Sequence, residues 1–305
     1  TGGTYTDAVI FDFGADRVLA NAKAVTTHEE LIVGIRAVLA KLPEATLAQV
    51  TRVGLSTTLA TNAFVENKGR PVGLLLMSRF DVDEAQLPFR FVHHIKGGMT
   101  IDGRESEAVD EAEVRHCARA AIASGCQALA VSGFGSVVNP IHEQQVARIA
   151  FDECGLHAVC GHELTSELNF LERATTAAMN AKLVPLIETL IDAVAAAMAD
   201  YGLQDARIMV VKGDGSQLLA EVARTVPVET VLSGPAASVV GAAKLFAGTD
   251  AVVADMGGTT LDVAVLRDGF PQLSERGARI GDFQTSVRAM RAQTIGLGGD
   301  SEIDL

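Results

Sequence analysis

The sequence predicts an α/β fold, because segments with the periodicity of helices and of strands alternate along its 305 residues. A second observation is a glycine motif that occurs twice, as TGGTYTD at 1–7 and as MGGTTLD at 256–262. Each copy is followed by an apolar run, at 8–11 and at 263–266. The match between the two copies therefore continues from the glycines into a predicted strand.

The first half of the chain carries clear signals for where its helices begin and end. Thr27 and Glu30 form a predicted capping box at the start of one amphipathic helix. A second helix is expected to begin at Asp110, with Glu113 in its first turn, and to end at Gly125. The predicted elements are a helix at 28–42, a strand at 73–77, a helix at 110–125, a strand at 128–134 and a helix at 139–155.

An alanine-rich helix at about 172–200 separates the two halves, with Pro185 expected to kink it and Gly202 to end it. We therefore expect an N-terminal domain at 1–171 and a C-terminal domain at 172–305. The remaining predicted elements are a strand at 207–213, a helix at 216–225 and a helix at 233–248 that leads into the second copy of the motif.

Charge and composition narrow the range of partners. The formal net charge of −13 argues against nucleic acid and anionic membranes. No apolar run approaches the roughly 20 residues that span a bilayer. Four cysteines without a CxxC pair favour a reducing, cytoplasmic location. A small anion is still compatible, because backbone N–H groups and a divalent cation can neutralise it locally.

The repeated motif predicts two β-hairpins whose glycine tips bind an anion. A glycine pair lets the backbone approach a ligand, and the neighbouring N–H groups form an anion-binding concavity. Asp7, Asp255 and Asp262 suit a magnesium site or the positioning of water. A simple tight turn would explain one copy, whereas two copies in register favour tips that grip a polyphosphate from two sides. The position that matches Asp255 falls just before Thr1, so the first acid is expected outside this chain.

Three other segments each allow two interpretations. The hydroxyls and amide of STTLATNAF at 56–64 either cap a helix or form a polar wall of a cleft. The helix that starts near Ser233 either faces an anion or is capped by that serine. The Cys/His cluster at 152–162 is either a metal site or a helix end followed by a buried strand, and its unusual spacing favours the second interpretation.

These motifs resemble those of the hydantoinase/oxoprolinase family, which includes N-methylhydantoinase, 5-oxoprolinase and acetone carboxylase subunits. The paired glycine hairpins resemble the phosphate loops of the actin and sugar-kinase superfamily. The segment VKGDGSQL at 211–218 departs from the family pattern, which often has an Asn-Gly-Gly motif at this position. The resemblance rests on TGGTYTDAV (1–9), STTLATNAFVENKGRPVGLL (56–75), VNPIHEQQVARI (138–149), HELTSELNFLERATTAAMNAKLVPLI (162–187), ETVLSGPAASVVGAAKL (229–245), DMGGTTLDVAVL (255–266) and TIGLGGDSEI (294–303).

The resemblance implies a two-lobed, actin-like ATPase fold of the ribonuclease H type, with paired phosphate-binding β-hairpins and with ATP and Mg²⁺ as cofactors. It implies that Asp255 is catalytic and that Asp7 and Asp255 hold the metal. The implied substrate contacts are Thr57, Thr58 and Asn62. The implied ATP contacts are Gly2, Gly3, Thr4, Thr6, Asp7, Gly257, Gly258, Thr259, Thr260, Asp262, Gly298 and Gly299.

The function that the resemblance implies is an ATP-dependent hydrolase subunit that phosphorylates and opens a cyclic amide, such as a hydantoin or 5-oxoproline. A second, larger subunit or a homo-oligomer is the implied assembly. The alternative is a nucleotide-sensing or assembly protein that uses the same ATP clamp as a switch. Chains of the family continue beyond the position of Leu305, so the C-terminal domain is expected to be incomplete here.

Overall fold

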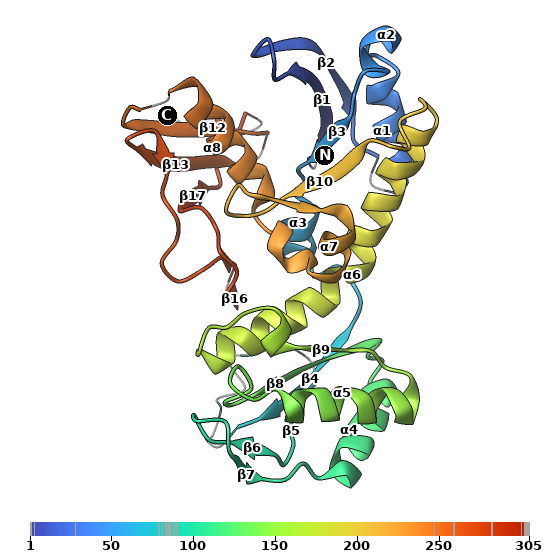
Figure 1. Cartoon of the computed structure of the whole chain (residues 1–305), viewed down its shortest axis with the longest axis vertical. Helices are drawn as coiled ribbons and strands as arrows, with labels where there is room; N and C mark the ends of the chain where they lie inside the picture. The colour runs from blue at the N-terminus through green and yellow to red at the C-terminus, as the bar shows by residue number, and fades with distance from the viewer. Residues whose placement is uncertain are drawn as a thin grey trace. The chain divides into compact units, whose positions relative to one another are not determined.

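The computed structural model divides the chain into two compact units (Figure 1). Unit 1 comprises residues 1–62, 186–278 and 288–305, and unit 2 comprises 63–185 and 279–287. The residues that the structure describes are 2, 4–27, 29–78, 80, 82, 87, 89, 91–246, 248–258, 260–281, 283–299 and 301.

The units differ from the contiguous domains expected at 1–171 and 172–305, because distant segments share a sheet. Strand β3 (Arg52–Leu55) pairs in parallel with β10 (Arg207–Val211), which in turn pairs with β11 (Gln217–Leu219). This pairing ties the first 62 residues to the second half of the chain. Both copies of the glycine motif consequently lie in unit 1.

Unit 2 is built on a four-stranded parallel sheet with strand order β5–β4–β8–β9. Every residue of the two central strands is buried, as expected for parallel strands that are covered on both faces. The strands of this sheet are β4 (Val72–Met77), β5 (Phe91–His94), β8 (Ala128–Gly133) and β9 (Ala158–Cys160).

Alternate side chains of the central strands pack against different helices. Leu75 and Val131 belong to one buried cluster with residues of α4 (Glu111–Ala123) and α5 (Ile141–Cys154). Leu74 belongs to the other cluster, with alanines from the first half of α6 (Phe170–Ala199). The smaller elements of unit 2 are β6 (Gly98–Met99), β7 (Glu105–Glu107), η2 (Gly161–Glu163), β15 (Arg279–Ile280) and β16 (Phe283–Gln284).

Unit 1 contains an antiparallel sheet at each copy of the motif. The first copy leads into β1 (Tyr5–Asp12), which pairs with β2 (Arg17–Val25). The second copy joins β12 (Ala251–Met256) to β13 (Leu261–Arg267) in a hairpin. On its other side β13 pairs with β14 (Phe270–Pro271) and β17 (Ala292–Ile295). The predicted glycine-tipped hairpin is therefore present in the second copy.

Helices complete unit 1. Helix α8 (Ser233–Leu245) packs on the second sheet through the buried Ala236 and Val239, which contact Ala264 and Leu266 of β13. The other helices of unit 1 are α1 (Leu31–Leu39), α2 (Glu44–Leu47), α3 (Leu59–Val65, which continues into unit 2), the second half of α6, α7 (Ala220–Thr225) and η3 (Pro227–Thr230). None of the helices traced over the described residues is long and apolar enough to cross a membrane.

Most predicted elements are confirmed, and the differences have local causes. The capping box at Thr27 and Glu30 is wrong, because the Thr27 hydroxyl donates to the Glu30 carbonyl and accepts from the Gly34 amide. The helix predicted at 216–225 begins only at Ala220, since residues 217–219 pair with β10. The buried strand expected after α5 is short and ends at Cys160.

The cap of α4 provides a test of the fold. Asp110 Oδ1 accepts hydrogen bonds from the amides of Ala112 at 3.0 Å and Glu113 at 3.1 Å. Asp110→Ala should lower the free energy of unfolding by about 0.5–2 kcal/mol, whereas Asp110→Asn keeps a capping oxygen and should change it little. Urea unfolding measures both variants, and equal losses in the two would contradict the cap.

Candidate functional site

The tips of the two motif copies are closed by the same backbone hydrogen bond. In the first copy the Gly2 amide donates to the Tyr5 carbonyl at 2.9 Å. In the second copy the Gly257 amide donates to the Thr260 carbonyl at 2.8 Å. These positions correspond in the sequence repeat, so the repeat is also a repeat of structure. Gly3 and Thr259, both expected at the tips, lie outside the described residues.

Both tips line one cavity within unit 1, with a volume of about 1610 Å³. Small-molecule pockets usually hold about 300–1,000 Å³, so this cavity has room for more than one small ligand. It extends along β1 and β3, and each of these strands has one edge without a partner strand in the part of the chain that the structure describes. The expected site residues that line the cavity are Gly2, Thr4, Thr6, Asp7, Thr57, Thr58, Asn62, Asp255, Gly257, Gly258, Thr260 and Asp262.

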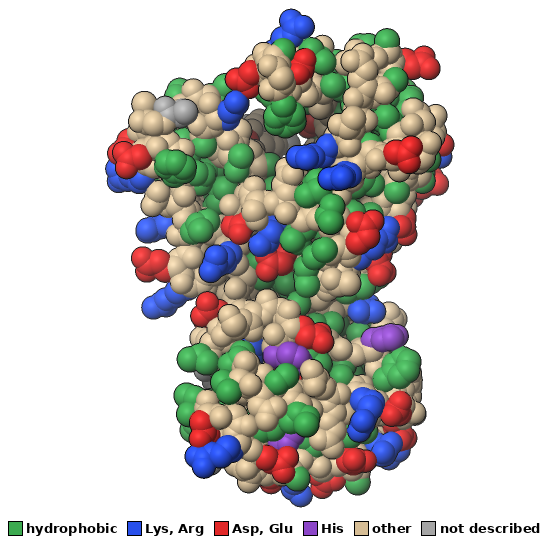
Figure 2. Space-filling view, viewed as in Figure 1, with side chains coloured by type: hydrophobic (Ala, Val, Ile, Leu, Met, Phe, Trp, Pro, Cys, Tyr) green, Lys and Arg blue, Asp and Glu red, His purple; other side chains and the backbone are tan. Residues whose placement is uncertain are grey.

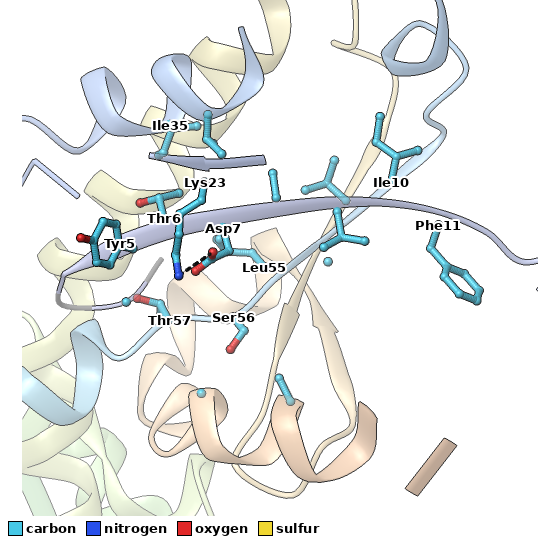
Figure 3. A pocket seen from close by; sticks show the side chains of 18 of the residues that line it. Tyr5, Thr6, Asp7, Ile10, Phe11, Lys23, Ile35, Leu55, Ser56 and Thr57 are labelled. Atoms are coloured by element: carbon cyan, nitrogen blue, oxygen red, sulfur yellow. Dashed lines mark ion pairs between the residues drawn. The ribbon is translucent and has the colours of Figure 1, made fainter. Parts of the chain in front are cut away.

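Successive side chains of β1 point in different directions. Figure 3 shows the Asp7 carboxylate and the ammonium end of Lys23 on the side of the strand that faces Ser56 and Thr57, and Thr6 on the opposite side. Asp7 is 61% exposed, and its carboxylate lies 3.5 Å from the Lys23 ammonium. A carboxylate so accessible is free to exchange this weak ion pair for a ligand or a cation.

Thr6 has a structural role at the first tip. Its side chain is buried, and its hydroxyl lies 3.0 Å from the hydroxyl of Thr26. The Thr26 hydroxyl donates in turn to the Gly2 carbonyl at 2.9 Å. Thr6 therefore helps to hold the tip in shape, and it also lines the cavity, where the family resemblance implies an ATP contact.

Two carboxylates face each other across the second hairpin. Asp255 and Asp262 are directly opposite in the antiparallel register of β12 and β13, so both side chains lie on the same face of the sheet. Each accepts a hydroxyl from another element: Ser238 of α8 donates to Asp255 Oδ2, and Thr294 of β17 donates to Asp262 Oδ1, both at 2.5 Å. Like charges in such a pair repel, and donors or a cation beside them offset this repulsion.

The hydroxyls at 56–62 are partly used within the fold. The Thr57 side chain is buried, and its hydroxyl accepts from the Leu59 amide at 3.0 Å, in the turn that precedes α3. Thr58 and Asn62 are half-buried and joined by a hydrogen bond of 3.3 Å. Thr57, Thr58 and Asn62 all line the cavity, and the bond from the Leu59 amide to Thr57 lies where α3 begins.

The start of α8 is fixed to this segment. The Ser233 hydroxyl donates to the Thr57 carbonyl at 2.8 Å and accepts from the Thr57 amide at 3.3 Å, so it does not cap its own helix. The Leu232 amide donates to the Thr61 hydroxyl at 3.1 Å. These bonds hold the first turn of α8 at the wall of the cavity, where Gly234 and Ser238 also lie.

The glycine turn near the end of the chain contacts the second tip. The Gly299 amide donates to the Gly257 carbonyl at 2.9 Å, and the Gly298 amide donates to the Ser301 hydroxyl. The turn therefore packs on the tip. Neither Gly298 nor Gly299 is among the residues that line the cavity.

The 211–218 segment, which departs from the family pattern, forms an ion cluster. Lys212 lies 2.8 Å from Glu229 and 3.4 Å from Asp214, and all three side chains are at most 20% exposed. Burial lowers the pKa of Lys212, but the hydrogen bonds and charges of Glu229 and Asp214 outweigh it and hold the pKa above its usual value. Lys212 is thus committed to stabilising this turn.

The Cys/His cluster at 152–162 contributes to a buried polar centre in unit 2. Cys160 and His162 lie near Glu143, with three potential donor atoms within 4.8 Å of one another. The Glu143 carboxylate is 2.6 Å from His162 Nδ1 and also accepts from the amides of Gly133 and His162. Two ligands of one tetrahedral zinc ion lie about 3.3 Å apart, so this spacing is that of a hydrogen bond.

A buried arginine accompanies this carboxylate. Arg173 is 1% exposed and donates to the Gly133 and Glu167 carbonyls. Burial lowers the pKa of its guanidinium, and the charge of Glu143 opposes that shift. Glu143 could not be recognised from the sequence as part of this centre, because the residues it joins lie on separate strands and helices.

Charged side chains are mixed over the visible surface. Figure 2 shows Lys and Arg side chains among Asp and Glu on the face drawn, although the net charge is −13. On this face the excess of acid is not gathered into one patch.

Comparison with known proteins establishes the family. Residues 1–154 match the hydantoinase/oxoprolinase N-terminal region, and residues 173–305 match the hydantoinase/oxoprolinase domain. The chain belongs to the hydantoinase/oxoprolinase family. The resemblance seen in its motifs is therefore confirmed.

The relatives that match this chain are named for different reactions. The alpha subunit of caprolactamase from Pseudomonas jessenii is 28% identical, over 98% of this chain and 47% of the relative. The gamma subunit of acetophenone carboxylase from Aromatoleum aromaticum is 26% identical, over 98% of this chain and 46% of the relative. The chain thus spans about half the length of these relatives.

Solved structures confirm the fold class. The nucleotide-free structure of acetone carboxylase matches with a TM-score of 0.80 at 18% identity, over 97% of this chain and 47% of that chain. The ATP-dependent caprolactamase from Pseudomonas jessenii matches with a TM-score of 0.74 at 25% identity, over 98% and 48%. The predicted α/β fold of the actin-like ATPase class is confirmed.

The Lys212 cluster yields a prediction with an internal control. Lys212→Met leaves two poorly solvated carboxylates without their cation and should lower the free energy of unfolding by about 1–3 kcal/mol. Lys244 forms a 2.8 Å ion pair with Asp16, but both side chains are more than 60% exposed. Lys244→Met should therefore cost less than about 1 kcal/mol. Chemical denaturation compares the two, and a larger loss for Lys244→Met would contradict the role of burial.

Proposed function

We propose that unit 1 binds ATP with Mg²⁺ in the cavity between the two glycine tips, and that the chain belongs to an enzyme that uses ATP to open a cyclic amide. Hydantoins and 5-oxoproline are examples of this substrate class. The observation that carries the proposal is that both tips, closed by equivalent hydrogen bonds, line one cavity. Backbone amides at such tips suit the phosphates of a nucleotide.

The carboxylates of the cavity fit a magnesium ion. Mg²⁺ prefers oxygen ligands and is usually held by one or two carboxylates together with substrate phosphates. The sequence motif nominated Asp7 and Asp255 for this role. Asp262 lies opposite Asp255, so a cation there would also relieve the repulsion between these two acids. Such a metal would neutralise charge on the transferring phosphoryl group.

The chemistry requires a second reactant beside ATP, and the cavity is large enough for both. In the proposed reaction the amide oxygen attacks the γ-phosphorus and ADP leaves. Water then adds to the carbon that bears the phosphorylated oxygen, the ring C–N bond breaks to give an amine and an acyl phosphate, and a second water hydrolyses the acyl phosphate to a carboxylate and phosphate. Asp255 would orient the reacting phosphoryl group or a water, while Thr58 and Asn62, with Thr57 behind them, would contact the amide.

The partner in this proposal is a second, larger subunit. Two of the relatives are named as subunits, alpha in caprolactamase and gamma in acetophenone carboxylase. The alternative assembly that we propose is a homo-oligomer. The four cysteines are all free thiols, which agrees with the predicted cytoplasmic location.

Nucleotide binding is tested directly by unfolding. Mg²⁺ with ATP at a hundredfold excess over the dissociation constant should raise the free energy of unfolding by about 2.7 kcal/mol, because only the folded state binds it. Thermal unfolding with and without Mg²⁺ and ATP measures the shift, and inorganic phosphate serves as the control. No shift with any nucleotide would contradict the proposed site.

A comparison of two acids tests catalysis. Asp255→Asn should leave the fold intact and lower ATP turnover on the order of 10²-fold, the usual scale for losing a positioned acid or base. Asp110→Asn changes an acid of unit 2 that caps α4 and lies 3.7 Å from the Lys96 ammonium, outside the cavity, so turnover should be unchanged. Steady-state ATP hydrolysis with hydantoin or 5-oxoproline present measures both variants.

The same measurement separates an enzyme from a nucleotide switch. A switch protein would show altered nucleotide affinity in Asp255→Asn, with no amide-dependent turnover in the unmodified protein. Equal hydrolysis by the two variants would remove Asp255 from the mechanism.

A further inference from the structure

The carboxylate of Asp255 is held by a side chain that is not among the expected site residues. The Ser238 hydroxyl donates to Asp255 Oδ2 at 2.5 Å, and both residues are half-buried and line the cavity. Among the described residues, no other side-chain hydrogen bond to Asp255 is found. Ser238 therefore anchors the carboxylate through Oδ2.

The position of Ser238 is fixed by packing on both sides of it. Val239 and Ala236 are at most 4% exposed and belong to the apolar cluster that joins α8 to β13. The first turn of the helix is fastened to the 56–62 segment by Ser233 and Thr61. Ser238 thus presents its hydroxyl from a rigid element, as a group that supports a catalytic residue must.

The carboxylate needs such a support because of its neighbour. Asp262 lies directly opposite Asp255 in the hairpin, so repulsion between the two charges favours side-chain orientations that separate them. Without a donor on α8, Asp255 would be free to rotate away from the orientation that faces the cavity. Hydrogen bonds to a charged group are among the stronger ones in proteins, so one well-placed donor selects one orientation of the carboxylate.

We propose that Ser238 is a positioning residue that fixes the orientation of the Asp255 carboxylate for phosphoryl transfer. This inference rests on the proposed ATP-dependent activity. It assigns Ser238 an effect on turnover that acts only through Asp255. A serine that merely fastened α8 to β12 would instead change stability or nucleotide affinity, whichever residue stood at 255.

The test is a double-mutant cycle on ATP turnover. Ser238→Ala should lower kcat about tenfold or more, while KM for ATP stays within about twofold. Ser238→Thr retains the hydroxyl and should keep most of kcat. In an Asp255→Asn background, Ser238→Ala should cause no further loss, because residues that act as a unit are not additive.

A matched control loses a hydroxyl elsewhere in unit 1. Ser274 donates to the Gly277 carbonyl at 2.7 Å and does not line the cavity, so Ser274→Ala should leave kcat unchanged. Circular dichroism and thermal unfolding verify that each variant is folded at the assay temperature.

The outcomes distinguish this inference from the function on which it rests. Normal turnover in the unmodified protein with an unaffected Ser238→Ala variant overturns the role of Ser238 alone. The same holds for losses that multiply in the double variant or for a Thr variant as slow as the Ala variant. Absence of amide-dependent turnover in the unmodified protein overturns the proposed function and this inference with it.

Discussion

One backbone hydrogen bond shapes each half of the candidate site. The amide of the first glycine in each copy donates to the carbonyl three residues later, and this bond turns the chain back at the tip. The two tips contribute Gly2 and Gly257 to the lining of the cavity in this form. At the first tip the Thr6 and Thr26 hydroxyls support the turn, and at the second the Gly299 amide bonds to it. The remaining backbone groups of the tips can then serve a ligand.

The second copy shows how strand register turns a motif into a site. The hairpin of β12 and β13 sets Asp255 opposite Asp262, a costly arrangement for two acids without donors or a cation beside them. The fold provides donors from Ser238 and Thr294, which belong to different elements. A pair of carboxylates arranged in this way is suited to a divalent cation and to phosphate chemistry. In the function that we propose, a bound cation would relieve the repulsion between Asp255 and Asp262 that is present in the free protein.

Local features of the molecule were predictable from the sequence, whereas those set by distant pairing were not. The repeat predicted the glycine-tipped hairpin, and the Asp110 cap followed from its spacing before an amphipathic run. The division into units was not predictable, because it depends on β3 pairing with a strand some 150 residues later. The same limit applies to Ser238, which meets Asp255 only once α8 packs on β13. The capping box at Thr27 failed because its hydroxyl bonds to the carbonyl of Glu30 and the amide of Gly34.

The central claim is that the two copies of the motif serve one nucleotide. Paramagnetic broadening by Mn²⁺ bound with ATP tests it most directly, since the ion broadens the amide signals of nearby residues in an NMR spectrum of the labelled protein. With Mn²⁺ and ATP at one equivalent, we expect simultaneous broadening of signals from Thr4–Asp7 and from Thr260–Asp262. Signals from α4 in unit 2 provide the reference. Broadening at only one copy, or at neither, would contradict a shared site.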